Sequence, residues 1–402
     1  MSVLFSNIKM HTWLFINILF LYFALFNWYY TFSYNILKLI IGENSIFIFF
    51  NSSFNLILYF TILLCGKLIK KAEKTTFIFI WTIISLLSQI FFIMNLNTLF
   101  KLIVYLFSGF IFGLSILSYF AYFWEFTTIE ERGRISGFMG LINLPIFSII
   151  TLLIMDLRMF KIIILCVIFN LIVLIILLKL KEKRLSIYKT TQKGFNPEKR
   201  VIILYLIPWI IFSFINVTLA KIINLNVWSH FPCIYTSLLI IIQLIGSSLG
   251  ALIGGIIADL FGRRLSITFG LTFYGISTAI SGLSKSYITF LLAFLGNGIS
   301  WGIFLTLYLF VIWGDLSNEE TFVHRYSIGL GIPFLANGVG IFFNSQVYNI
   351  PLLYATLIIC LLIFISNIPL IMAPELLPSD FRERIHLKLY LYFVKLRKRR
   401  FS

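Results

Sequence analysis

The amino-acid sequence predicts an all-α integral membrane protein, with twelve transmembrane helices arranged as two pseudo-symmetric six-helix bundles. Three observations support this prediction: the apolar composition, a regular series of apolar segments, and a repeat that relates the two halves of the chain. Of the 402 residues, 60% are hydrophobic and 12% are charged, whereas soluble globular proteins have about 45–50% apolar and about 25% charged residues. The composition therefore excludes an ordinary soluble domain.

Each apolar segment is long enough to cross a membrane as a helix. About 20 apolar residues cross a hydrocarbon core about 30 Å thick, and the sequence has no alternating ten-residue segments of the kind that form outer-membrane barrels. In the first half the apolar segments lie at residues 12–35, 45–69, 76–96, 99–124, 135–155 and 160–180. In the second half they lie at residues 201–222, 232–258, 265–284, 287–313, 326–347 and 350–372.

These segments divide the chain into four parts. We expect an N-terminal six-helix bundle at residues 1–180, a basic cytoplasmic linker at 181–200, a C-terminal six-helix bundle at 201–373 and a basic cytoplasmic tail at 374–402. The first segment has no short apolar core followed by a cleavage site, so we expect no cleaved signal peptide.

The net charge of +17 is explained by orientation in the membrane. Short cytoplasmic loops collect Lys and Arg, and 26 of the 32 basic residues fall on the side of the two termini and the linker. The other side holds only Lys38, Lys101, Arg158, Lys161, Lys221 and Lys285. We therefore expect a multi-pass protein of the plasma membrane, embedded in the lipid bilayer, with both termini in the cytoplasm. No soluble domain is large enough to carry a basic surface, so we expect no nucleic-acid partner.

A repeat relates the two halves at an offset of 189 residues. The pairs are Gly66 with Gly255, Gly109 with Gly298, Gly113 with Gly302, Trp124 with Trp313, Glu130 with Glu319, and Glu131 with Glu320. The paired residues fall at equivalent segments, which indicates two related halves. Parallel repeats joined by a cytoplasmic linker are typical of transporters built as two bundles around a central cavity.

The loop after the eighth segment carries the most specific motif in the chain. Residues 255–264 read Gly-Ile-Ile-Ala-Asp-Leu-Phe-Gly-Arg-Arg. This segment resembles the G-x-x-x-D-x-x-G-R-K/R signature of the major facilitator superfamily, in both residue type and spacing. The resemblance implies the major facilitator fold and a transport function. The equivalent loop of the first half departs from the signature, because Lys70 and Glu73 stand where Asp259 and Gly262 stand in the second half.

A second stretch, residues 125–133, resembles the E-x-x-P-x-x-x-R-G pattern of the sugar-porter and organic-ion branches of that family. Thr128 replaces the usual proline. The counterpart in the second half is Asp315 with Arg325, and Pro374-Glu375 is similar to the P-E-T end of several such branches. The resemblance therefore covers essentially the whole chain.

The resemblance implies a cytoplasmic gate made of acids and arginines that pair across helices and separate as the halves rock. In this sequence the gate residues would be Gly255, Asp259, Gly262, Arg263, Arg264, Glu125, Arg132, Arg134, Asp315 and Arg325. The alternative interpretation of these residues is a set of ordinary surface ion pairs, worth about 0–1 kcal/mol each.

The middle of the predicted membrane contains almost no ionisable residue, although such residues usually mark ion or proton pathways. We therefore expect a cavity lined by amides and aromatic side chains, with the candidates Asn27, Trp28, Asn143, Asn216, Gln243, Asn297, Trp301 and Asn337. Neutral donors of this kind favour a neutral, amphipathic or sugar-like solute. For each of these residues, hydrogen bonding between helices is the alternative role.

These features predict a monomeric secondary transporter that moves a small molecule by alternating access, with proton or ion coupling left open. Two alternatives remain: a non-transporting sensor on the same scaffold, and a proton-coupled exporter. We expect neither an enzyme nor a cofactor. Dispersed cysteines give no metal-ligand spacing, and a membrane-embedded transferase would need more acidic residues on one face than Glu43 and Asp156 provide.

Overall fold

The computed structural model describes residues 12–42, 45–64, 66–71, 73–94, 96–155, 159–182, 197–218, 220–283, 286–347, 350–383 and 387. All regular structure in these residues is helical. The first half contains α2 (Thr12–Asn27), the π-helix η1 (Trp28–Ser33), α3 (Tyr34–Ile41), α4 (Ser45–Leu64), α5 (Gly66–Lys71), α6 (Lys74–Ile93), α7 (Thr98–Phe126), α8 (Arg132–Met155) and α9 (Met159–Glu182). The second half contains α10 (Lys199–Val217), α11 (Ala220–His230), α12 (Cys233–Leu260), α13 (Arg263–Leu283), α14 (Tyr287–Phe304), the π-helix η3 (Leu305–Val311), α15 (Ile312–Asp315), α16 (Phe322–Val347) and α17 (Leu352–Met372).

These helices cover each of the twelve predicted segments. Within the described residues, seven stretches are long and apolar enough to cross a membrane by length and composition: Ile46–Leu64, Lys74–Ile93, Thr98–Phe126, Lys199–His230, Tyr235–Leu260, Tyr287–Asp315 and Leu352–Met372. The all-helical prediction is therefore confirmed. Most of the basic linker and almost all of the tail beyond residue 383 lie outside the described residues.

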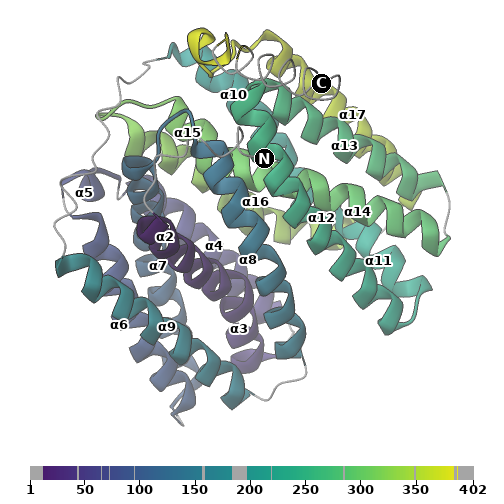
Figure 1. Cartoon of the computed structure of the whole chain (residues 1–402). Helices are drawn as coiled ribbons and strands as arrows, with labels where there is room; N and C mark the ends of the chain where they lie inside the picture. Colours follow the sequence, from purple (N-terminus) through teal and green to yellow (C-terminus); the bar gives the residue numbers. More distant parts are fainter. Residues whose placement is uncertain are drawn as a thin grey trace, which may run out of the picture.

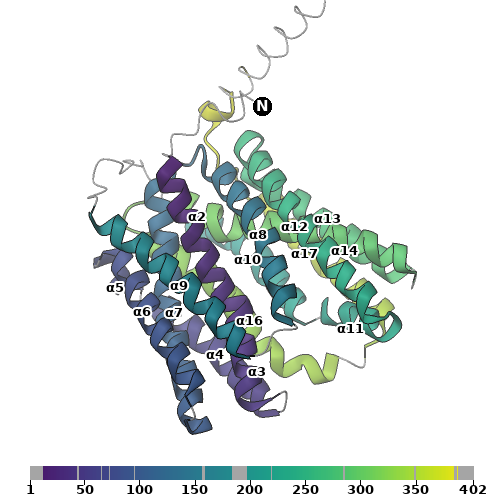
Figure 2. The ribbon, with the colours of Figure 1, turned by 60° about the horizontal axis from the view of Figure 1, so that its bottom comes forward.

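Figure 1 shows most helices of the first half, from purple to teal, toward the lower left and most helices of the second half, from teal-green to yellow, toward the upper right, with α15 above the helices of the first half. The most extensive packing between the halves is that of α8 against α12 and of α4 against α16, and smaller contacts join α8 to η3 and α16 to α7. Figure 2 gives the same arrangement from a second direction, with α8 beside α12 and α4 beside α16. The repeat relates these pairs, because an offset near 190 residues places α4 on α12 and α8 on α16.

Glycines allow the helices of the second half to approach closely. A Cβ atom at Gly302 in α14 would overlap the carbonyl oxygen of Ser247 in α12, and one at Gly250 in α12 would overlap the carbonyl oxygen of Ile299. Small residues at such crossings let two backbones come into contact within a membrane. The four-residue spacing of glycines in this part of the sequence is thus a packing feature of α12 and α14.

The tenth predicted segment is a single continuous helix with a change of winding in its middle. It runs through α14, η3 and α15, from Tyr287 to Asp315, and the seven residues of η3 form a π-helix. π-Helical segments are rare and occur often at functional sites. This helix carries Trp301 in its α14 part and Asp315 at its end.

Candidate functional site

Asp259 at the end of α12 binds the N-terminus of α8, which belongs to the other half. Its Oδ1 accepts from the backbone N–H of Gly133 at 3.0 Å, and its Oδ2 accepts from the backbone N–H of Arg134 at 2.8 Å and from the Nε–H of Arg134 at 3.1 Å. The first N–H groups of a helix have no partner within the helix, and a negative charge is favoured there. A Cβ at position 133 would collide with this carboxylate, so the contact requires glycine.

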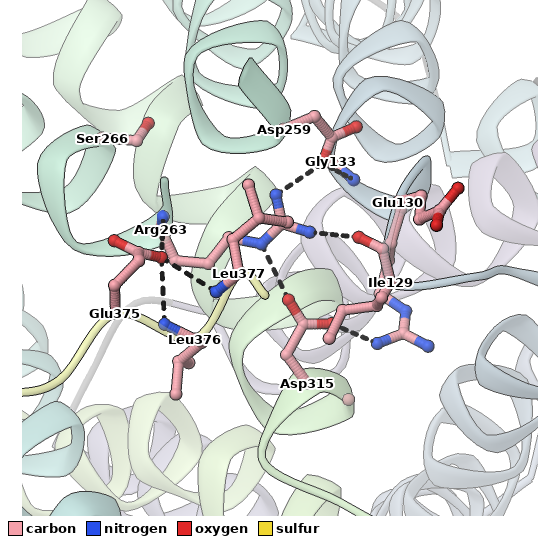
Figure 3. A network of polar contacts seen from close by, with 12 residues as sticks. Ile129, Glu130, Gly133, Asp259, Arg263, Ser266, Asp315, Glu375, Leu376 and Leu377 are labelled. Carbon is pink, nitrogen blue, oxygen red and sulfur yellow. Dashed lines mark hydrogen bonds and ion pairs between the residues drawn. The ribbon is translucent and has the colours of Figure 1, made fainter. Parts of the chain in front are cut away.

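Arg263 and Asp315 extend this contact into a network that joins the halves. Arg263 donates through Nη1 to Asp259 at 2.5 Å, through Nε to Asp315 at 2.7 Å, and through Nη2 to the carbonyl oxygen of Ile129 at 2.5 Å. Arg132 of the first half completes it with an ion pair to Asp315. Figure 3 shows Arg263 at the centre, between the two carboxylates.

The charged side chains of this network are almost completely buried. Asp259, Arg132 and Arg263 are 0% exposed, and Asp315 is 3% exposed. Burial lowers the pKa of the Arg263 guanidinium, but the charges and hydrogen bonds of Asp315 and Asp259 more than offset this and raise that pKa above the ordinary arginine value. We call these four residues with Arg134 the gate network, and the end of the molecule that contains them the gate end.

Glu375, which follows α17, holds the start of α13 in place. Its carboxylate accepts from the backbone N–H groups of Arg263 at 2.6 Å and Arg264 at 3.1 Å, and from those of Leu376 and Leu377 at 3.0 and 3.1 Å. Figure 3 shows Glu375 next to Arg263, on the side away from Asp315. The carboxylate thus positions the backbone of the gate arginine.

Replacing Glu375 with glutamine is expected to lower the free energy of unfolding by about 1 kcal/mol, the usual effect of losing a helix cap. Glutamine would keep one oxygen that can accept from the backbone N–H groups at the start of α13. It would lose the negative charge, which stabilises a helix N-terminus. Thermal unfolding of the purified protein measures the change. Asp380→Asn is the matched control, because Asp380 lies near by in the sequence and is exposed. Equal stability of the two variants would contradict the capping role.

Three charged residues of the predicted gate lie outside the gate network. Glu125 forms an ion pair with Lys74 at the edge of the first half. Arg264 donates to the carbonyl oxygen of Ala373 at 3.1 Å, on the surface beside Glu375. The Nε–H of Arg325 is buried without a hydrogen-bond partner within the described residues.

The two predicted glycines of the signature have distinct roles. Gly262 has a φ of +124°, in the region that favours glycine, and it forms the turn between α12 and α13. A Cβ at Gly255 would overlap the carbonyl oxygen of Gly133, so this position allows α12 to contact α8. The equivalent Gly66 has looser surroundings, since a Cβ there would lie 3.6 Å from the Val323 side chain. The packing at Gly255 is therefore tighter than that at its repeat partner Gly66.

Three cavities lie away from the gate end. The aromatic cavity, of about 220 Å³, lies between the halves and is lined by residues that include Phe26, Phe112, Trp209 and Phe212. The interfacial cavity, of about 200 Å³, also lies between the halves, and Asn27, Asn143 and Gln243 are among its lining residues. The amide cavity, of about 310 Å³, lies in the second half and is lined by residues that include Asn216, Lys221, Asn224, Asn297 and Asn337.

Trp301 lines all three cavities, so they are separated by little more than one side chain. Asn216 and Asn337 line both the aromatic and the amide cavity, and Gln243 lines both the interfacial and the amide cavity. Seven of the eight predicted cavity residues therefore come together around Trp301. Trp28 is the exception: it is 4% exposed and stacks on Phe112 at 4.8 Å between ring centroids, inside the first half.

The cavities lie along the same helices as the gate network, farther from the gate end. Tyr205 of α10 donates to the carbonyl oxygen of Pro374, next to Glu375, at 2.8 Å. Asn216 comes eleven residues later in α10, which corresponds to about 16 Å at about 1.5 Å per residue. A solute in the cavities would thus be separated from the gate end by the packed network.

Two functional candidates were absent from the sequence prediction. Lys221 was assigned to the surface opposite the gate, but it is half-buried and lines the amide cavity. Glu375 was noted only as part of a resemblance, without a partner. A count of charges per loop could not reveal either role, because each role depends on which other helices the side chain contacts in the fold.

Comparison with known proteins supports the resemblance. Residues 212–312 match the family model described as "Sugar (and other) transporter". No curated protein matches the chain in sequence.

Solved structures are similar over almost the whole chain. Two crystal structures of a bacterial homologue of the iron transporter ferroportin, both in an outward-facing state and one with soaked iron, have TM-scores of 0.72 and 0.71 at 13% and 14% identity. In both comparisons the match covers 90% of this chain and 98% of the other. The human organic anion transporter MFSD10 (TETRAN) has a TM-score of 0.66 at 11% identity, over 89% of this chain and 98% of the other. At these identities the similarity establishes the fold.

Proposed function

We propose that this chain, which has the fold and the family match of a major facilitator superfamily transporter, moves a small amphipathic or sugar-like solute across the plasma membrane by alternating access. The observation that carries the proposal is the combination of a gate network closing one end with solute-sized cavities beyond it. Binding sites for small molecules are typically apolar cavities with a few polar groups. The aromatic cavity fits this description, because its wall is mainly aromatic and aliphatic and also contains the amides of Asn216 and Asn337.

In the proposed cycle, the described conformation is closed at the gate end and receives solute from the opposite side. Rocking of the halves would then separate Asp259 from α8 and Asp315 from Arg132, which opens the gate end. The charge distribution of the loops supports a cytoplasmic location for that end. The similarity to structures captured in an outward-facing state agrees with this assignment.

Uptake by the purified chain in proteoliposomes tests the proposal. A panel of small molecules is first screened for thermal stabilisation, because a ligand that binds the folded state raises its apparent stability. We expect at least one stabilising compound to be taken up with saturation, without dependence on an imposed pH gradient. A compound that stabilises the chain but crosses in neither direction would contradict transport and favour the sensor alternative. Uptake that requires a pH gradient, with that requirement lost in Glu125→Gln, would instead indicate proton coupling.

Replacing Trp301 with alanine is expected to raise the KM for the solute found in this screen by about tenfold or more, as for a buried aromatic residue at the centre of a binding site. The reason is that Trp301 faces all three cavities. Trp301→Phe should keep most of the affinity. Trp228→Ala is the matched control, because Trp228 is 56% exposed and lies on the outside of α11. An unchanged KM in Trp301→Ala would remove this residue from the site.

A further inference from the structure

Lys221 is the only charged side chain among the described residues that line the amide cavity. It lies at the start of α11, close in sequence to Asn216 at the end of α10 and to Asn224. None of the described residues that line this cavity is acidic. Its surroundings are amides and aromatic rings, so the positive charge is surrounded by neutral groups.

Within the described residues, the ammonium group of Lys221 has no hydrogen-bonded or ion-paired partner. By contrast, Lys74, Arg132, Arg134 and Arg263 at the gate end or its edge each pair with a carboxylate. An ammonium group that is partly removed from water without a counter-charge is destabilising. A negatively charged group in the cavity would compensate it, with the strength of a charge-assisted hydrogen bond.

The amide next to Lys221 also presents a donor to the cavity. Trp301 donates its indole N–H to the Oδ1 of Asn216 at 2.9 Å. Because an indole N–H can only donate, the amide oxygen of Asn216 must face the ring, and its NH₂ group remains for another acceptor. No described residue accepts from that NH₂ group. An ammonium and an amide NH₂ thus lie on one cavity wall with free donors.

The neighbouring aromatic cavity has the opposite character. Asn216, Asn337 and Trp301 line both spaces, and beyond them the wall is made of rings such as Phe26 and Phe212. A ligand that spans the two would place a group of acceptor oxygens at Lys221 and an apolar body among the rings. Neutral amides alone favour a neutral solute, whereas the positive charge of Lys221 favours a negatively charged one.

We infer that the solute is an organic anion, with a carboxylate or similar acidic head group bound by Lys221 and Asn216 and an apolar body in the aromatic cavity. This inference deepens the proposed function, since it depends on the cavities being the solute site. It names the charge of the solute, which the proposed function leaves open.

Binding of phenylacetate and of its uncharged isostere phenylacetamide tests the inference. Both probes are titrated against the purified full-length chain in detergent, and thermal unfolding reports binding. Wild type is expected to bind the carboxylate about tenfold more tightly than the amide, the difference between a charge-assisted and a neutral hydrogen bond. Lys221→Gln should lose this preference and keep its affinity for the amide, whereas Lys221→Arg should retain the preference.

Lys199→Gln is the matched control, because Lys199 is exposed at the gate end of α10, and it should behave as wild type. Equal affinity of wild type for the two probes, or no binding of the carboxylate at millimolar concentration, would overturn the inference. So would a Lys221→Gln variant that keeps the preference. If the carboxylate binds through Lys221 but is not taken up into vesicles, transport fails while the head-group assignment stands. If both probes are taken up equally well, transport stands and the assignment fails.

Discussion

Replacing Asp259 with asparagine is expected to open the gate end and to abolish net uptake. The carboxylate receives two backbone N–H groups and the Arg134 guanidinium from the other half, and the Arg263 guanidinium from its own half. Removing one partner from a buried ion pair costs about 3–5 kcal/mol, because the other charge stays buried without compensation. Since this cost falls only on the closed conformation, the equilibrium should shift toward the open one by about 100-fold or more.

Distances between spin labels at positions 73 and 265 measure the shift. Both positions are exposed, one lies in each half, and both lie toward the gate end. After replacement of the four cysteines, the label distance should be short in the parent protein and long in Asp259→Asn. Glu125→Gln is the matched control, because the Glu125–Lys74 pair is partly in contact with water and lies within the first half. We expect that variant to keep the short distance.

A second variant separates gate opening from loss of folding. Gly133→Ala leaves every charge in place but puts a methyl group where the Asp259 carboxylate lies. It should lengthen the label distance as Asp259→Asn does. If both variants unfold cooperatively near the temperature of the parent protein and keep the short distance, the gate network does not hold the two halves together.

Replacing Gly302 with alanine is expected to have the other large effect, on the stability of the second half. The new methyl group would overlap the carbonyl oxygen of Ser247 and lie 2.5 Å from the backbone nitrogen of Ala251, so α12 and α14 would have to move apart. Overpacking of this kind costs about 1–3 kcal/mol, and more where backbone atoms are in the way. Thermal unfolding of the purified protein should show a clear decrease in Tm.

Gly275→Ala is the matched control, because a Cβ there would lie 3.6 Å from the Ile363 side chain, an ordinary contact. It should leave Tm nearly unchanged. A Gly302→Ala protein as stable as the Gly275→Ala protein would show that α12 and α14 can separate at little cost. The Gly302 variant should not change which end of the molecule is open, since the contact it disturbs lies within one half.

The helices could be predicted well from the sequence, because a segment that crosses a lipid bilayer can adopt few backbone structures. Backbone groups in hydrocarbon must bond within the segment, so apolar length alone identified α6, α7, α12 and α17. The changes of winding at η1 and η3 left no such signal. Neither segment contains proline or glycine, the residues that would mark a change of winding in a sequence.

The positions of the charged gate residues could be predicted from the sequence, but their partners could not. The signature placed Asp259 and Arg263 at a helix end, where charges remain near the membrane surface, and the second motif placed Arg132 near them. The partners could not be read from spacing. Asp259 binds the start of α8, where Gly133 and Gly255 let the two helices approach closely, whereas Glu125 pairs with Lys74.

The change of winding at η3 has a mechanical consequence. One helix carries Trp301, which faces the cavities, and Asp315, which belongs to the gate network, and the seven π-helical residues lie between them. A π-helix has more residues per turn than an α-helix. Rewinding this stretch toward α-helical geometry would therefore rotate Asp315 about the helix axis relative to Trp301. Binding of a solute at Trp301 would then change the ion pairs of Asp315 through rotation within this one helix, without deformation of either half.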